Sequence, residues 1–222
     1  MDSTVRNRMK LLDHLPLEDK YNVYTHFFGA VLSVFGTLWL GYHLEAEVVS
    51  VYFGTVLYGS SLVVLFLAST IYHSVQKSYR AFWQKVDHIA IYGLIAGTYT
   101  PVGLTVLYQD RGLYLIAAVW MLALIGIGYK LFFMSRWQGF SLFLYLAMGW
   151  LVVLESKSVY HSFSQDALFH LIVGGIIFTV GVVFYRWHSW RWHHVVWHLF
   201  VLAGAFFHFL MVKEVLSQMG YL

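Results

Sequence analysis

The sequence contains no cysteine, which excludes disulfide bonds, thiolate metal ligands and a cysteine nucleophile. Charged residues are also scarce: they make up 11% of the 222 residues, whereas an average soluble protein has about 25%. Fourteen basic and eleven acidic side chains are too few to cover the surface of a soluble protein of this length. Hydrophobic residues make up 59% of the chain, which excludes a disordered protein. We therefore expect most of the chain to lie in lipid.

Seven apolar stretches follow one another with brief connections. A membrane-spanning helix needs about 20 mostly apolar residues, and five of the stretches meet that length, while the fifth is short and the sixth is marginal. Lipid offers no hydrogen-bond partner to an unpaired backbone, which favours helices. The stretches are continuously apolar and do not alternate, which disfavours a β-barrel. They cover residues 23–42, 48–72, 89–108, 113–133, 140–154, 168–184 and 194–211.

The sequence thus predicts an all-α polytopic membrane protein, a seven-transmembrane helix bundle. Residues 1–20 are polar and are expected to form a cytoplasmic juxtamembrane arm, and residues 21–222 are expected to form the transmembrane domain. With seven spans, a cytoplasmic N-terminus places the C-terminus outside. The basic residues are scattered singly and in short groups, so they indicate topology and not a nucleic-acid surface.

The distribution of lysine and arginine predicts the orientation. With seven spans and the N-terminus inside, eleven basic residues lie on the cytoplasmic side and three outside, a strong positive-inside asymmetry. If residues 140–154 did not cross, the tally would again be eleven to three, so charge alone does not determine the number of spans. The eleven are Arg6, Arg8, Lys10, Lys20, Lys77, Arg80, Lys85, Lys130, Arg136, Arg186 and Arg191, and the three are Arg111, Lys157 and Lys213.

Ionisable groups next to apolar runs are costly and are therefore candidates for function. Asp87 lies at the start of the third stretch, where an acidic residue also simply favours the helix dipole. Ser69 and His73 are four residues apart at the end of the second stretch, and His194 and His198 have the same spacing at the start of the seventh. Side chains four apart share one helical face, so two such histidines can bind one zinc ion. In a chain with 12 histidines, the pair can also be incidental.

The seven-span arrangement brings these residues to the same membrane side. His73, His194 and His198 would then hold Zn²⁺ and leave its fourth tetrahedral position open, which is the catalytic pattern. Asp87 would hold or deprotonate a water, and the Ser69 hydroxyl would hydrogen-bond to that water or to a substrate oxygen. With six spans the histidines would lie on opposite sides, and the site would not form. The zinc prediction therefore depends on the fifth stretch crossing.

Other histidines have more ordinary interpretations. His26 and Asn22 enter the first stretch on the same side and would either support the metal ligands or form an interhelical hydrogen bond. His208 follows His198 by ten residues, about 15 Å along a helix, and is too distant to bind the same metal. His88 and His193 are neighbours of the proposed ligands and serve as alternative ligands.

In order and spacing, the motifs resemble the hemolysin III-like bacterial membrane proteins, and through them the progestin and adipoQ receptor (PAQR) superfamily and its alkaline ceramidase relatives. The matching segments are NVYTH at 22–26, STIYH at 69–73, KVDH at 85–88, AGTYTP at 96–101 and HVVWH at 194–198. The resemblance implies seven helices in a bacterial inner membrane, with a cytoplasmic N-terminus. It also implies zinc on His73, His194 and His198, with Asp87 and Ser69 beside a zinc-bound water.

Three function classes follow. The leading one is a zinc-dependent intramembrane hydrolase that acts on an amide or ester bond of a membrane lipid and serves lipid homeostasis, with Asp87 as general base. The alternative is a membrane-state sensor or receptor in which zinc is structural and no turnover occurs. The third, a pore former, is implied by the hemolysin label. It is disfavoured because no helix carries a polar stripe along its full length.

Overall fold

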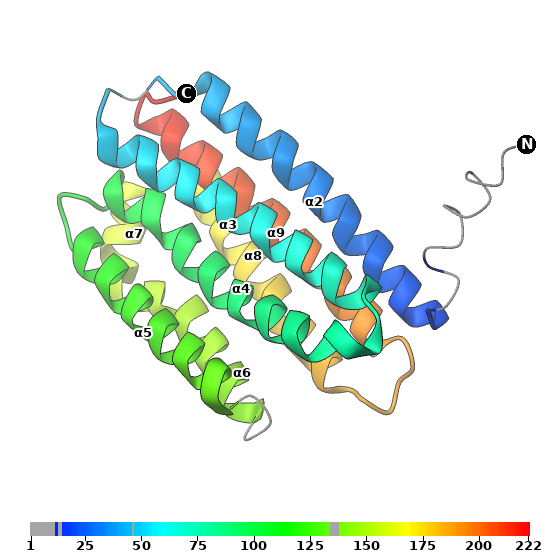
Figure 1. Ribbon diagram of the computed structural model, residues 1–222. Helices are drawn as coiled ribbons and strands as arrows, with labels where there is room; N and C mark the ends of the chain where they lie inside the picture. Colours follow the sequence, from blue (N-terminus) through cyan, green and yellow to red (C-terminus); the bar gives the residue numbers. More distant parts are fainter. Residues whose placement is uncertain (1–11, 13–14, 46, 134–137) are drawn as a thin grey trace, which may run out of the picture.

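The computed structural model is a bundle of long helices that run roughly antiparallel to one another (Figure 1). It describes Leu12 and residues 15–45, 47–133 and 138–222. Within these residues all regular secondary structure is helical, and no strand is present. The predicted all-α class is therefore confirmed.

The helices follow the predicted apolar stretches but extend beyond most of them. Those before the fifth stretch are α2 (Leu17–His43), α3 (Val49–Ser74), α4 (Lys77–Leu104) and α5 (Gly112–Phe133). The fifth stretch is divided among α6 (Gln138–Gly149), the 3-10 helix η1 (Leu151–Glu155) and α7 (Ser156–Ser162). The chain then forms α8 (Gln165–Arg186) and α9 (His193–Gln218).

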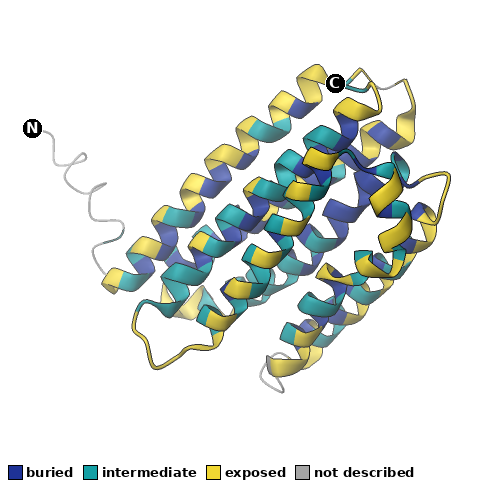
Figure 2. Cartoon of the chain, turned by 180° about the vertical axis from the view of Figure 1, so that it is seen from behind, coloured by how far each residue is buried: buried dark blue, intermediate teal, exposed yellow. Residues whose placement is uncertain are grey.

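Six helical segments of the described chain are long and apolar enough to cross a membrane: α2, α3, α5, Gly139–Ser162, α8 and α9. The side chains on the outside of the bundle fit this environment, because large hydrophobic residues such as Phe35, Leu38 and Leu124 are well exposed. Figure 2 shows buried residues along the inward faces of the helices and exposed ones along the outward faces. The chain is therefore a multi-pass membrane protein.

The fifth stretch is longer than the sequence suggested, since the apolar segment spans the 24 residues Gly139–Ser162. It runs alongside α4 in the same direction: the Tyr145 hydroxyl donates to the His88 carbonyl at 2.8 Å, and further along the Tyr99 hydroxyl donates to the Met148 carbonyl at 2.8 Å. Tyr99 Oη also accepts from the Val152 N–H at 3.0 Å. Where α6 ends and η1 begins, some backbone N–H and C=O groups lose their partners within the helix. The Tyr99 hydroxyl hydrogen-bonds to these groups, which compensates for their burial.

α4 is the exception among the predicted stretches, because it is not among the six apolar segments. It begins at Lys77, well before the predicted start at residue 89, and so includes charged residues. All residues of the α4 segment 96–103 are buried, and the helix contacts α3, α5, α6 and α9. A helix surrounded by protein needs less apolar surface than one facing lipid. Its threonines donate to carbonyls one turn back within the same helix, Thr98 to Leu94 and Thr100 to Ala96.

Different helix ends and connections lie at the two ends of the bundle. At one end α3 ends, and α2, α4 and α9 begin (Figure 1). At the opposite end the C-terminal segment meets the connection between α2 and α3, where the Glu45 N–H donates to the Tyr221 carbonyl at 2.9 Å. α2 packs against α3 and α9, and α8 packs mainly against α9. The first end, called the histidine end below, contains the predicted site residues His73, His194 and His198.

Candidate metal centre

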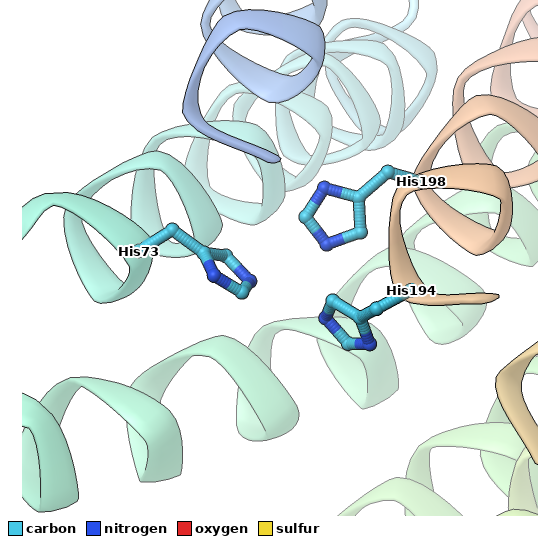
Figure 3. Close-up of side chains that lie close together, drawn as sticks. All are labelled: His73, His194 and His198. Atoms are coloured by element: carbon cyan, nitrogen blue, oxygen red, sulfur yellow. The ribbon is translucent and has the colours of Figure 1, made fainter. Parts of the chain in front are cut away.

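Three histidines from two helices converge at the histidine end. His73 belongs to the last turn of α3, and His194 and His198 belong to the first two turns of α9. Each offers one ring nitrogen, and these nitrogens all lie within 4.8 Å of one another. The ring centroids of His194 and His198 are 4.7 Å apart, and those of His73 and His198 are 4.9 Å apart. Figure 3 shows the three rings around one common space.

The donors fit a metal ion. The His73 Nδ1 faces Asp19, and its buried Nε2 has no hydrogen-bond partner among the described residues. His198 Nδ1 lies 3.4 Å from the Thr25 hydroxyl, so its other nitrogen is free to face the common space. In a tetrahedral zinc site with bonds of about 2.0–2.1 Å, the ligand nitrogens lie about 3.3 Å apart. The three histidines therefore need only small side-chain movements to bind one ion. The predicted three-histidine group can therefore bind a metal ion.

Asp19 and Arg80 support His73, and the sequence had not indicated either of them. Asp19 Oδ1 lies 3.0 Å from His73 Nδ1, and Arg80 Nη2 donates to both Asp19 oxygens at 2.8 Å. A carboxylate on the far nitrogen of a ligating histidine fixes its tautomer and leaves Nε2 as the ligand atom. Asp19 fell in the predicted polar arm, but α2 begins at Leu17 and includes it. An acidic residue in a first turn looks like an ordinary dipole partner, so the sequence held no distinguishing signal.

His26 and Asn22 of α2 also lie against the three histidines. The His26 ring stacks on His198 with centroids 3.6 Å apart and an angle of 12° between the planes. Both ring nitrogens of His26 are buried without a partner in the described part of the chain. Asn22 Nδ2 lies 3.5 Å from His73 Nδ1. Both residues therefore lie beside the proposed ligands, and His26 is outside the group of possible ligands.

A cavity of about 40 Å³ adjoins the histidines, and Ser69 and Asp87 line it together with His194 and His198. This volume holds an ion or one to a few waters. Ser69 Oγ is buried beside the Asp87 carboxyl and makes no hydrogen bond of standard geometry within the described residues. Its hydroxyl thus lies beside Asp87 at the cavity wall. The structure therefore brings all five predicted site residues to the same end of the bundle.

The remaining histidines near the site have other surroundings. His88 lines the same cavity but does not belong to the metal-competent group. His193 stacks on His188 with centroids 5.1 Å apart. His208 lies further along α9 against Phe178, as its distance from His198 predicted.

A second, apolar cavity of about 110 Å³ lies next to the first one. It is lined by residues of α3, α4, α6, α8 and α9. The two cavities share the side chains Leu65, Ile91, Leu142, Tyr145, Trp197 and Val201. The polar chamber beside the histidines is therefore adjacent to an apolar chamber deeper in the bundle.

Comparison with known proteins agrees with this architecture. The family described as "Haemolysin-III related" matches residues 16–209. The chain is 39% identical over 194 residues to a hemolysin-3 homolog of Bacillus subtilis (strain 168), covering 85% of this chain and 89% of that protein. It is 36% identical over 207 residues to hemolysin-3 of Bacillus cereus, covering 92% and 94% of the two chains.

A more distant similarity extends to animals. The chain is 28% identical over 180 residues to the human monocyte to macrophage differentiation factor, covering 76% of this chain and 71% of the human protein. The matched region of the bacterial family contains His73, Asp87, His194 and His198. The resemblance seen in the motifs is thus confirmed over most of the chain, which belongs to the haemolysin-III-related family.

Proposed function

We propose that this protein is a zinc-dependent hydrolase of the bacterial plasma membrane that cleaves an amide or ester bond of a membrane lipid and serves lipid homeostasis. The observation that carries the proposal is that three histidines lie close enough to hold one metal ion, and that two of them, His194 and His198, line a small cavity together with Asp87 and Ser69. Three protein ligands leave one tetrahedral position free, as in catalytic zinc sites, whereas structural sites are closed by four.

The chain path supports seven membrane crossings with a cytoplasmic N-terminus. The end of α3 and the start of α9 lie at the same end of the bundle, so an even number of passages separates them. Four segments lie between them: α4, α5, the α6–α7 segment and α8. They give four crossings, an even number, if α4 crosses the membrane as its apolar neighbours do. The excess of basic residues on one side then supports the orientation.

The donor set favours zinc over the common alternatives. Neutral imidazoles suit zinc, copper, iron and nickel, whereas magnesium and calcium prefer oxygen ligands. The histidine end is enclosed by protein, and Asp19 holds His73 in the tautomer that a metal requires. Because zinc has no redox chemistry, its presence would favour a hydrolytic reaction.

The chain's own groups can perform the steps of hydrolysis. When bound, zinc supplies Lewis acidity, which polarises a carbonyl group and makes water a stronger acid. Asp87 accepts the proton of the attacking water and then returns it to the leaving amine or alcohol. The Ser69 hydroxyl donates to an oxygen of the substrate or of the water. The apolar chamber behind the site excludes bulk water and accommodates a hydrocarbon chain of the substrate.

The test combines elemental analysis with an activity assay on purified protein. We expect stoichiometric zinc in the wild type, its loss in His73→Ala and in His194→Ala, and fatty-acid release from a lipid amide or ester only by the zinc-loaded wild type. Zinc retained in a His194→Ala/His198→Ala variant would contradict the assigned ligands. Zinc that is required for folding, without turnover of any lipid tested, would instead support the sensor or receptor function.

A further inference from the structure

Lys130 lies at the polar cavity, although its place in the sequence suggests only a topological role. It is the only charged residue of α5 and belongs to the last turn of that helix. It is 3% exposed. The buried residues of α5 form one inward stripe at spacings of three and four: Gly112, Leu115, Val119, Ala123, Gly126 and Lys130.

This placement differs from that of an ordinary lysine at a helix end. Such a lysine compensates the helix dipole and extends its ammonium to the membrane surface. Lys130 instead lines the cavity that also contains Asp87 and Ser141. Burying an ammonium is costly, and residues that do so inside membrane proteins mark ligand or ion sites.

Among the described residues, the hydrogen-bonding capacity of Lys130 is not used. An ammonium has three donors, yet no hydrogen bond or ion pair of Lys130 is found within the described part of the chain. Asp87 attracts it electrostatically without forming an ion pair within 4.0 Å. Ser141 Oγ, on the same cavity wall, is buried beside the Tyr92 hydroxyl and makes no hydrogen bond of standard geometry among the described residues. A cation and a hydroxyl thus line the same cavity.

The charges of the cavity favour an anion. With a divalent ion on three neutral imidazoles, the metal and Lys130 carry more positive charge than Asp87 alone balances. The apolar chamber next to the cavity is lined by side chains such as Leu94, Ile95 and Val182. The polarity of the two chambers matches an amphiphile that has an anionic head and a hydrocarbon chain.

We propose that Lys130, assisted by Ser141, binds an anionic oxygen group, a carboxylate or a phosphate, on an acyl-chain lipid whose chain occupies the apolar chamber. Lys130 is then a specificity-determining residue. Binding of an anionic lipid does not require the proposed hydrolase. Only the substrate class, a lipid that carries negative charge near the cleaved bond, rests on that proposed function.

Binding of matched amphiphiles tests this assignment without turnover. Dodecanoate, dodecyl phosphate and uncharged dodecanol are titrated into detergent-solubilised protein as purified, without metal chelation. Lys130→Gln should weaken binding of the two anions about 10- to 100-fold, the usual range for a hydrogen bond to a charged group, and should leave dodecanol within about twofold. A greater loss for the phosphate than for the carboxylate identifies the head group as phosphate, and the reverse identifies it as carboxylate.

Two matched variants serve as controls. Lys130→Arg keeps the charge and should retain the preference for anions. Lys213→Gln removes a lysine that is paired with Glu214 far along α9 and should change nothing. The proposal would be overturned if Lys130→Gln lost affinity equally for the anions and the alcohol, or lost none. If Lys130→Gln does not fold, Lys130→Arg measures the preference for anions over the alcohol instead. Charge-selective binding without lipid hydrolysis would retain this inference and reject the hydrolase.

Discussion

Two histidines of α9, the buried His198 and the half-buried His208, have very different surroundings. His198 is stacked on His26 and lies 4.9 Å, ring centroid to ring centroid, from His73 of another helix. His208 packs against the Phe178 ring, and Gly174 leaves room for it. Both are histidines inside an apolar helix, so a histidine in such a position does not by itself make a site. Only the first belongs to a set of converging ligands.

Two polar side chains in the two halves of the bundle differ in their hydrogen bonds. At the histidine end, His73 Nε2 has no partner in the described residues. Further along the bundle the Tyr99 hydroxyl makes three hydrogen bonds to the backbone between 2.8 and 3.0 Å. Buried atoms without a partner among the described residues also occur away from the histidine end, for example Tyr58 Oη, so such an atom points to a ligand only where it converges with other ligands, as His73 Nε2 does.

The largest effect is expected from removing a ligand. His198→Ala should abolish stoichiometric zinc binding, because two imidazoles cannot close the site. His208→Ala, a change of the same size on the same helix, should keep full zinc content. Elemental analysis of both purified variants measures this difference. Equal zinc loss in the two variants would mean that the contrast between the two positions is incorrect.

Asp87→Asn should separate metal binding from chemistry. The amide cannot accept a proton, so we expect turnover of a lipid substrate to fall about 10²- to 10⁴-fold, the typical contribution of a general base. Zinc content should remain that of the wild type, because Asp87 is not a ligand. The check is initial rates and metal content on the same preparation, and undiminished activity would exclude Asp87 as the base.

Asp19→Asn should have an intermediate effect. Without the carboxylate, His73 is less strongly fixed in the tautomer that leaves Nε2 as the ligand atom. Removing a group that hydrogen-bonds to a metal ligand typically lowers metal affinity or activity about 10- to 100-fold. Competition with a chelator of known zinc affinity measures the change. Glu18→Gln, next to it in the first turn of α2, is the matched control, since Glu18 pairs with Arg191 and not with the histidines. Wild-type affinity in Asp19→Asn would show that the contact does not support the site.

Tyr99→Phe should have the smallest effect on the site and should affect stability instead. It removes the hydroxyl that pairs the Met148 and Gly149 carbonyls and the Val152 N–H. Unpaired buried groups of this kind cost about 1–3 kcal/mol, so thermal unfolding in detergent should occur at lower temperature with unchanged zinc affinity. A lowered zinc affinity would show that the two halves of the bundle are coupled.

Much of this architecture could be predicted from the sequence because lipid imposes simple rules. Apolar runs predicted the helices, and the ends of α3, α5 and α8 lie within two residues of the predicted ones. The spacing of four between His194 and His198 indicated a shared helical face. The length of the fifth stretch was underestimated because its α-helix is interrupted by η1 after Gly149. Periodicity along the chain does not reveal an irregular helix whose backbone groups hydrogen-bond to Tyr99 of α4.

The sequence by itself determined that the chain lies in a membrane, that it is helical and which residue types were candidates for a metal site. The tertiary structure decided which candidates meet: it joined His73 to His194 and His198, added Asp19 and Arg80, and turned Lys130 inward. The physical reason is that lipid selects helices through local composition, which is readable along the chain. Convergence of ligands depends on how distant helices pack, and no local pattern contains that information.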